Sequence, residues 1–473
     1  MPLASEFQVD LGSCATYQVE ESFLSMNNEP SLTSPHTRRH FLQGSGTLAI
    51  GGALLPYITV KERGFAANSD TLKVGLVGCG GRGTGAASQA LNADPNVVLH
   101  AVGDVHDDKL QVSLKSLREE ASIGSRVKVT PETTFIGLDS YKKVLDSGVD
   151  VVLLATPPGF RPFHLRAAIE AGKHVFCEKP MATDAPGVRS VMASAKLAKE
   201  KKLALVSGFC WRYNFAEREM MKRIHDGQIG DPMSLYTVYN TGALWVNPRK
   251  PTQTDLQYQL RNWYYFTWLS GDHIVEQAVH SIDKMAWAMK DEPPVKCVAH
   301  GGRQVRTGPD YGHIFDHFSA VYEYANGARG YHFCRQQPGC ASDNSDYIIG
   351  TKAVARIKAF GPLTIVGGGN NWKYAGERPN MYQVEHNELF ASIRSGNPLN
   401  DGEWMARSTM TAIMGRMAAY TGQELTWEQA LNSEENLTKQ ACGQEGKEGD
   451  PEFRWDMKLF VPPVAMPGQT RFA

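Results

Sequence analysis

Between residues 70 and 206, short apolar runs alternate with amphipathic stretches. The mostly apolar runs predict buried strands at residues 72–77, 97–103, 149–155 and 174–177. The stretches between them place apolar residues at helical spacing. Strands and helices that alternate in this order are typical of an α/β domain with a parallel sheet, which we expect over residues 70–206.

After residue 206 the pattern changes to an alternation with a period of two. Strand-like alternation covers residues 232–239, 314–324 and 328–333. We therefore expect a second domain over residues 207–432. A charged and then proline-containing tail follows at residues 433–473, and we expect residues 437–452 to form a solvated loop.

Residues 1–69 fit neither pattern. Arg38 and Arg39 precede Phe41, and a mildly apolar stretch rich in glycine and alanine follows at residues 44–58. This stretch is too short and too rich in glycine for a membrane span. A basic region, an apolar region and small residues in this order are typical of an export signal, and the paired arginines resemble the twin-arginine (Tat) type, which moves folded proteins. We expect an exported, periplasmic protein with no membrane span in its mature form; the alternative is a cytoplasmic protein.

Net charge and cysteine content argue against some classes of ligand and cross-link. Lys and Arg number 49 and Asp and Glu 50, so the formal net charge is −1. Binding to nucleic acid requires a basic face, so we expect no such partner. The eight cysteines form no CxxC pair, which argues against a zinc or disulfide framework. His313 and His317 have a metal-like spacing but no evident third ligand, so we expect no metal site.

A glycine-rich loop follows the first predicted strand. It has the form GxGxxG and consists of Gly78, Cys79, Gly80, Gly81, Arg82 and Gly83. The first glycine permits a tight turn, the second lets the backbone approach a pyrophosphate, and the third allows a helix to pack closely on a strand. The helix that follows offers free N–H groups to the phosphates. The loop therefore predicts a dinucleotide-binding site.

Asp104 ends the second predicted strand, about twenty residues after the glycines. A carboxylate there accepts hydrogen bonds from the adenosine ribose and repels the 2′-phosphate of NADP. No arginine occurs in the segment that follows directly, at residues 105–108. We therefore predict NAD as the cofactor and regard NADP as the less favoured alternative.

Further motifs follow in a diagnostic order. Ala-Thr-Pro-Pro begins at Ala155 and is followed by His164, by Ala-Gly-Lys-His-Val at residues 171–175 and by Glu-Lys-Pro at residues 178–180. With the glycine-rich loop and Asp104, this order resembles the Gfo/Idh/MocA family of oxidoreductases over essentially the whole chain after residue 70.

The resemblance implies an N-terminal Rossmann domain and a C-terminal α/β domain with one large, mostly antiparallel sheet. The outer face of that sheet commonly forms the dimer interface in the family, so we expect a homo-oligomer. The resemblance also adds residues to the glycine-rich loop and Asp104 at the cofactor site. They are Thr156, Pro157, His164, Glu178 and Lys179.

The resemblance assigns three catalytic residues. Lys179 ends a strand, where its ammonium would stabilise the developing alkoxide of a substrate. His280 matches the family's general base, and a histidine suits proton transfer near neutral pH. Glu276 lies four residues earlier, on the same face if the segment is one helix, where it would orient the histidine or bind substrate. The family often has Asp at the Glu276 position.

Three further residues are predicted to bind substrate. Asp283 matches a substrate contact of the family. Arg212 lies in the segment that resembles the family's crossover between domains, and we expect it in the cofactor or substrate cleft. Tyr264, with Trp263, precedes the His280 segment closely, and aromatic faces stack on the C–H faces of sugars.

Together these features predict an NAD-dependent oxidoreductase that takes hydride from a secondary alcohol of a sugar, polyol or glycoside. One alternative is an NAD-dependent glycoside hydrolase that works by oxidation, elimination and re-reduction. Another is a non-catalytic sugar sensor on the same fold. Export of a folded protein also favours an enzyme that retains its cofactor between two half-reactions.

Overall fold

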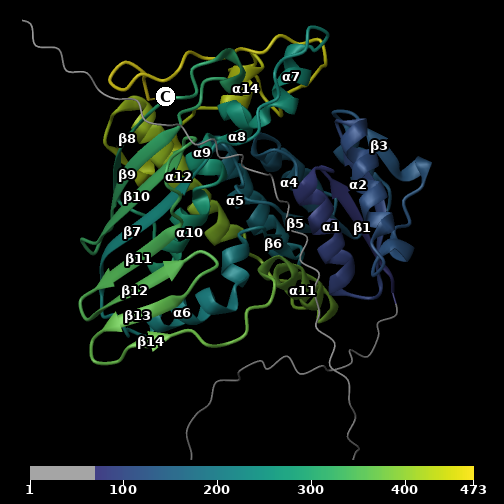
Figure 1. Ribbon diagram of the computed structural model, residues 1–473. Coiled ribbons are helices and arrows are strands. Elements are labelled where there is room, and N and C mark those ends of the chain that lie inside the picture. The colour runs from purple at the N-terminus through teal and green to yellow at the C-terminus, as the bar shows by residue number, and fades with distance from the viewer. Residues whose placement is uncertain (1–69, 473) are drawn as a thin grey trace, which may run out of the picture. The chain divides into compact units, whose positions relative to one another are not determined.

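The computed structural model describes residues 70–472 (Figure 1). The predicted export signal lies outside the described residues. The described part of the chain contains two sheets, the first built from β1 to β6 and the second from β7 to β15. No helix in this part is long and apolar enough to cross a membrane.

The first sheet is parallel throughout, with the strand order β3-β2-β1-β4-β5-β6 of a Rossmann fold. Its strands are β1 (Leu72–Val77), β2 (Val97–Asp104), β3 (Thr134–Ile136), β4 (Val151–Leu154), β5 (His174–Cys177) and β6 (Leu205–Ser207). The helices between them are α1 (Gly81–Ala93), α2 (Asp107–Glu119), α3 (Ser140–Asp146), α4 (Arg161–Glu170) and α5 (Ala185–Glu200). The central strands are mostly apolar because neighbouring helices pack on the sheet, and every residue of β4 is buried.

The second sheet has nine strands in the order β14-β13-β12-β11-β7-β10-β9-β8-β15. All pairs are antiparallel except β7 with β10. Its strands are β7 (Pro232–Thr241), β8 (Lys296–Gly302), β9 (His317–Glu323), β10 (Arg329–Gln336), β11 (Ser345–Gly350), β12 (Ala353–Lys358), β13 (Leu363–Gly367), β14 (Trp372–Lys373) and β15 (Leu425–Thr426). This confirms the expected fold class, a Rossmann domain followed by an α/β domain with a large, mostly antiparallel sheet.

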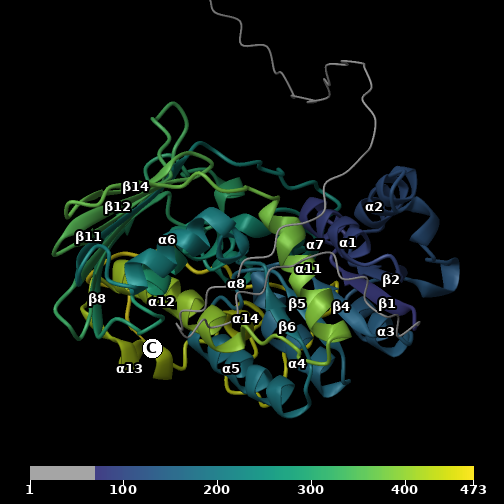
Figure 2. The same cartoon turned by 90° about the horizontal axis from the view of Figure 1, so that it is seen from below.

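The helices of the second half are α6 (Phe215–His225), α7 (Asp255–Arg261), α8 (Thr267–Ser270), α9 (His273–Glu276), α10 (Val279–Ala288), α11 (Met381–Arg394), α12 (Gly402–Thr421), α13 (Trp427–Asn432) and α14 (Leu437–Ala441). Of these, α6, α10 and α12 pack on one face of the second sheet, as Figure 2 shows for α6 and α12. Almost every residue of α12 is buried, because this helix lies between the second sheet and α5 of the first domain.

Helix α11 packs on α1 of the Rossmann domain, although it follows the second sheet in the sequence (Figure 1). Arg394 pairs with Asp94 at 2.7 Å, and Gln383 donates a hydrogen bond to the carbonyl of Gln89. The first domain is thus completed by a helix from the far end of the chain.

The expectation of a solvated loop at residues 437–452 is wrong at its start. Residues 437–441 form α14, and Leu437, Ala441 and Cys442 are buried in an apolar cluster. The prediction gave weight to the charged residues of this segment and overlooked three apolar side chains at helical spacing.

Candidate functional site

The glycine-rich loop has the shape that a pyrophosphate requires. Gly78 has φ +97°, and a Cβ there would lie 2.7 Å from the backbone carbon of Ala155. A Cβ on Gly83 would lie 1.9 Å from the carbonyl oxygen of Gly78, so only glycine lets α1 pack this closely. At Gly80 and Gly81, by contrast, a Cβ would meet nothing within 4 Å. The backbone of these two residues is therefore open to a ligand, and the loop fits a dinucleotide.

Asp104 stabilises the glycine-rich loop through a hydrogen bond to its backbone. Its carboxylate accepts hydrogen bonds from the backbone N–H of Cys79 at 2.6 Å and of His106 at 2.8 Å, and the side chain is 8% exposed. Burial raises the pKa of this carboxyl group and also that of the Cys79 thiol, which therefore stays protonated and unreactive. Asp104 thus fixes the turn and reaches the pocket where a ribose would bind.

A pocket lies at the carboxyl ends of β1, β2 and β4, where doubly wound sheets bind ligands. Its walls include Gly78, Gly80, Asp104, Thr156, Pro157 and His164. These are six of the predicted cofactor residues. The ring of His164 stacks on Tyr141 and contacts the hydroxyl of Thr156 at 3.3 Å. Burial lowers its pKa to about 3, so it is neutral and adds no charge to the pocket.

Arg82 and Glu178 lie together beside this pocket. Nε of Arg82 is 2.7 Å from Oε1 of Glu178, and the guanidinium packs over the ring of Tyr382 on α11. Glu178 is 4% exposed, and a Cβ on Gly208 would lie 2.5 Å from its Oε2. The ion pair joins the glycine-rich loop to the end of β5. Both residues were predicted to bind the cofactor, and the structure shows them bound to each other.

Lys179 follows Glu178 and precedes a cis peptide bond to Pro180. Its ammonium donates a 2.5 Å hydrogen bond to the backbone carbonyl of Glu276 and lies 3.2 Å from the Glu276 carboxylate. Arg161, which the sequence did not single out, donates a 2.5 Å hydrogen bond to the carbonyl of Pro180. Arg161 is fully buried and follows the pocket residue Phe160, so it links the Lys179 segment to the wall of the pocket.

His280 lies in the first turn of α10 and is half-buried. Burial lowers its pKa well below the ordinary value, and the positive charges of Lys179 and Lys284 lower it further. Its Nδ1 is buried and has no hydrogen-bond partner among residues 70–472. The ring is therefore neutral at physiological pH and carries an unshared nitrogen, as a general base requires.

The prediction that Glu276 and His280 share one helix is wrong. Helix α9 ends at Glu276 and α10 begins at Val279, because the N–H of Ala278 bonds back to the carbonyl of His273 and shifts the register. The Glu276 carboxylate turns to the ammonium of Lys179, a charged partner that a neutral imidazole cannot match. Glu276 thus orients the lysine and not the histidine.

Arg212 and Asp283, both predicted to contact ligand, bind each other. Arg212 forms hydrogen bonds of 2.8–3.1 Å to the carboxylate of Asp283 and also pairs with Asp291. Its guanidinium lies between the rings of Trp287 and Trp404. Asp283 is 1% exposed and also accepts from the hydroxyl of Ser408. Both groups of this buried charge pair are bound to several protein partners, so we assign the pair a structural role.

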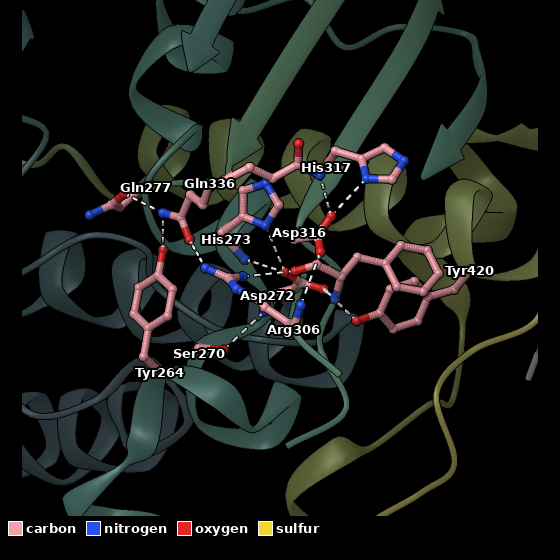
Figure 3. Close-up of polar contacts among 12 residues, drawn as sticks. Tyr264, Ser270, Asp272, His273, Gln277, Arg306, Asp316, His317, Gln336 and Tyr420 are labelled. Carbon is pink, nitrogen blue, oxygen red and sulfur yellow. Dashed lines mark hydrogen bonds and ion pairs between the residues drawn. The ribbon is translucent and has the colours of Figure 1, made fainter. Parts of the chain in front are cut away.

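Tyr264 is buried in a polar network that includes Gln277, the residue after Glu276 (Figure 3). Its hydroxyl accepts a 2.8 Å hydrogen bond from Gln336, which also donates to Gln277 at 2.6 Å and accepts from Arg306. Gln277 stands at the break between α9 and α10. The network therefore supports the segment that carries Glu276 and Gln277, and the predicted role of Tyr264 in stacking on sugar does not fit its burial. Its neighbour Trp263 lines the dinucleotide pocket.

The other end of this network holds the entry to α9 (Figure 3). Asp272 has φ +72°, which is unusual for a residue other than glycine. Its carboxylate compensates by accepting from the N–H of Phe315 at 2.7 Å and from the hydroxyl of Tyr420 at 2.6 Å. The segment that carries Glu276 is thus fixed from both sides.

Comparison with known proteins identifies both domains. Residues 72–209 match the model of an oxidoreductase family with an NAD-binding Rossmann fold, and residues 218–356 match the GFO/IDH/MocA C-terminal domain. An inositol 2-dehydrogenase of Saccharopolyspora erythraea is 29% identical over 260 residues, 55% of this chain and 65% of that protein. An inositol 2-dehydrogenase of Acidiphilium cryptum is 27% identical over 47% of this chain and 55% of that protein. The chain thus spans less than two thirds of the length of these relatives.

Solved structures show the same fold. An aldose–aldose oxidoreductase from Caulobacter crescentus superposes with a TM-score of 0.59 at 19% identity, over 75% of this chain and 99% of that one. A levoglucosan dehydrogenase in complex with NADH and levoglucosan gives a TM-score of 0.59 at 18% identity, over 75% of this chain and 99% of the other. With matches to both domain models over more than half of its length, the chain belongs to the Gfo/Idh/MocA family of NAD-binding oxidoreductases.

Proposed function

We propose that the protein is an NAD-dependent dehydrogenase that oxidises a secondary alcohol of a polyol or sugar. The observation that supports this most is a fixed ammonium, Lys179, whose charge acts on a neutral imidazole, His280, in a protein that also has a pocket built for a dinucleotide. An ammonium and a neutral base are the two groups that the oxidation of an alcohol requires from a protein.

The residues would divide the reaction as follows. His280 accepts the hydroxyl proton of the substrate on its neutral imidazole ring. The ammonium of Lys179 hydrogen-bonds the same oxygen and stabilises the negative charge that develops on it. Glu276 holds the ammonium in place through its carbonyl and its carboxylate. NAD, bound on the glycine-rich loop, supplies the acceptor for the hydride of the alcohol carbon.

The named relatives favour a polyol or sugar as substrate. The curated relatives carry the name inositol 2-dehydrogenase, and the solved structures include enzymes named for aldose and levoglucosan. We therefore propose a cyclic polyol or a sugar in its ring form as the substrate class.

The activity is tested by mixing the purified protein with NAD and a panel of inositols, aldoses and glycosides, and following NADH formation. A dehydrogenase forms NADH with a subset of the polyols or sugars. A glycoside hydrolase would release an aglycone without net NADH formation. A sensor would bind sugar and form neither product, and its response would be unchanged in a His280→Ala variant.

We also propose export and self-association. The twin-arginine pattern at Arg38 and Arg39 supports export through the Tat route to the periplasm. Figure 2 shows helices on one face of the second sheet, and the opposite face carries exposed apolar side chains. They include Tyr236, Val298, Ile349 and Val366. A second copy of the chain would cover this face, and the mass of the protein in solution, measured by light scattering, tests it.

A further inference from the structure

A bidentate ion pair crosses one end of the dinucleotide pocket. Arg261, the last residue of α7, donates hydrogen bonds of 2.7 and 2.6 Å to the two carboxylate oxygens of Asp108, in the first turn of α2. The two residues are 153 positions apart and belong to the two halves of the described chain. The charge of Arg261 lowers the pKa of Asp108 to about 2, so the pair stays ionised at any physiological pH.

The positions next to this pair line the pocket. Leu260, directly before Arg261, and Trp263, shortly after it, form one wall. His106 and Lys109, on either side of Asp108, form part of the opposite wall, next to Asp104. Because Asp104 marks the ribose position, the ion pair joins the two walls at the adenosine end of the cofactor.

The pocket wall formed by Leu260 and Trp263 is supported by apolar packing on its far side. Leu256, Leu260 and Trp268 pack in one apolar cluster with Phe160 of the Rossmann domain. The C-terminal tail covers this cluster, with Phe453 against the rings of Phe160 and Trp268. The N–H of Leu459 donates to the carboxylate of Asp255 at the start of α7. Opening of this wall therefore requires both the ion pair and part of the apolar cluster to separate.

We infer that Arg261 and Asp108 form a clasp that retains the dinucleotide in its pocket. The inference rests on the proposed function and deepens it. An enzyme that releases its cofactor slowly uses the same molecule for an oxidation and then for a reduction, so the clasp favours two half-reactions on one bound NAD. The hydride taken from a first alcohol then passes to the carbonyl carbon of a second sugar, which takes up a proton as it is reduced.

The clasp is tested by the rate at which the dinucleotide, bound in its reduced form NADH, leaves the full-length holoenzyme. Bound NADH accepts energy from nearby tryptophans such as Trp263, so a chase with excess NAD reports the release of NADH as a loss of this transfer. In Arg261→Gln and Asp108→Asn we expect release about five to ten times faster, since each change removes one charge of the pair and its bidentate geometry. The matched control is Asp107→Asn, a neighbouring carboxylate in the same helical turn that contacts only Gln111 in the structure.

The charge swap Asp108→Arg with Arg261→Asp should restore slow release. Salt should accelerate release from the wild type and not from the single variants, because Asp108 is 63% exposed and its pair is screened. Release rates equal to the wild type in both single variants, with unchanged melting temperatures, would overturn the clasp. If the wild type binds no NAD at all, the proposed function fails instead, and the two failures are thereby distinguished.

Discussion

The ammonium of Lys179 donates a 2.5 Å hydrogen bond to the backbone carbonyl of Glu276 and lies 3.2 Å from its carboxylate. Both side chains are only 13% exposed. The contact joins the end of β5 in the Rossmann domain to the end of α9 in the second half of the chain. It places a fixed positive charge near His280, where that charge contributes to keeping the imidazole neutral.

Replacement of the ammonium should slow the chemical step and spare cofactor binding. In Lys179→Met we expect kcat to fall by about a hundred- to a thousandfold, because the developing oxyanion loses its positive partner. The dissociation constant for NAD, measured by calorimetry, should change little, since Lys179 contacts Glu276 and not the glycine-rich loop. A matched control is Lys173→Met, a lysine that precedes β5 and lies outside the site. Equal kcat values in the two variants would remove Lys179 from the mechanism.

The pH profile should reveal the lowered pKa of His280. The base works only when neutral, and burial together with Lys179 and Lys284 holds its pKa below the ordinary 6.5. Activity should therefore persist as the pH falls through 6.5 and decline only at lower pH. The measurement is kcat/KM against pH, with His280→Asn losing about a hundred- to ten-thousandfold at the plateau. An acid limb centred at or above 6.5 would contradict a neutral, buried base.

Substitutions of two glycines in the loop should have different effects, one on folding and the other on cofactor binding. Gly83→Ala places a Cβ 1.9 Å from the Gly78 carbonyl oxygen, so α1 must move and the melting temperature should fall. Gly80→Ala meets nothing within 4 Å in the protein, so it should melt normally, yet it should bind NAD more weakly because the methyl group occupies the path of the pyrophosphate. A Gly80→Ala variant with unchanged NAD affinity would show that the ligand does not approach this loop.

The Arg212–Asp283 pair should behave as a structural element. Asp283→Asn leaves the guanidinium without its buried countercharge, so we expect a loss of about 3 kcal/mol in the free energy of unfolding, measured with denaturant. Asp291→Asn serves as the control, because Asp291 is 24% exposed and water replaces its charge more easily. A normally stable Asp283→Asn protein with a raised KM would instead restore the original prediction of a substrate contact.

The parts of the fold and of the site that could be predicted from the sequence are those that depend on local patterns. The glycine-rich loop, Asp104 and the Glu-Lys-Pro segment each consist of residues close in sequence, and the parallel strands of the first sheet are mostly apolar runs. Their place in the fold follows from the order of strands and helices alone.

Partners that come from distant segments could not be predicted. Asp283 has its charge satisfied by Arg212, 71 positions earlier, and Arg261 meets Asp108 across 153 positions. The helical spacing of Glu276 and His280 was misleading, because a shift of one backbone hydrogen bond at Ala278 separates the two residues into different helices. A sequence shows the charges of a site, but packing decides which of them remain free for a ligand.

The most direct test of the central claim uses the purified protein without added cofactor. The bound dinucleotide is released by denaturation and identified by mass, and the absorbance of NADH is followed in the native protein while polyols and sugars are added one by one. The account predicts bound NAD that is reduced by at least one polyol or sugar, and no such reduction in Lys179→Met. A protein that carries no dinucleotide and has no affinity for added NAD would contradict it.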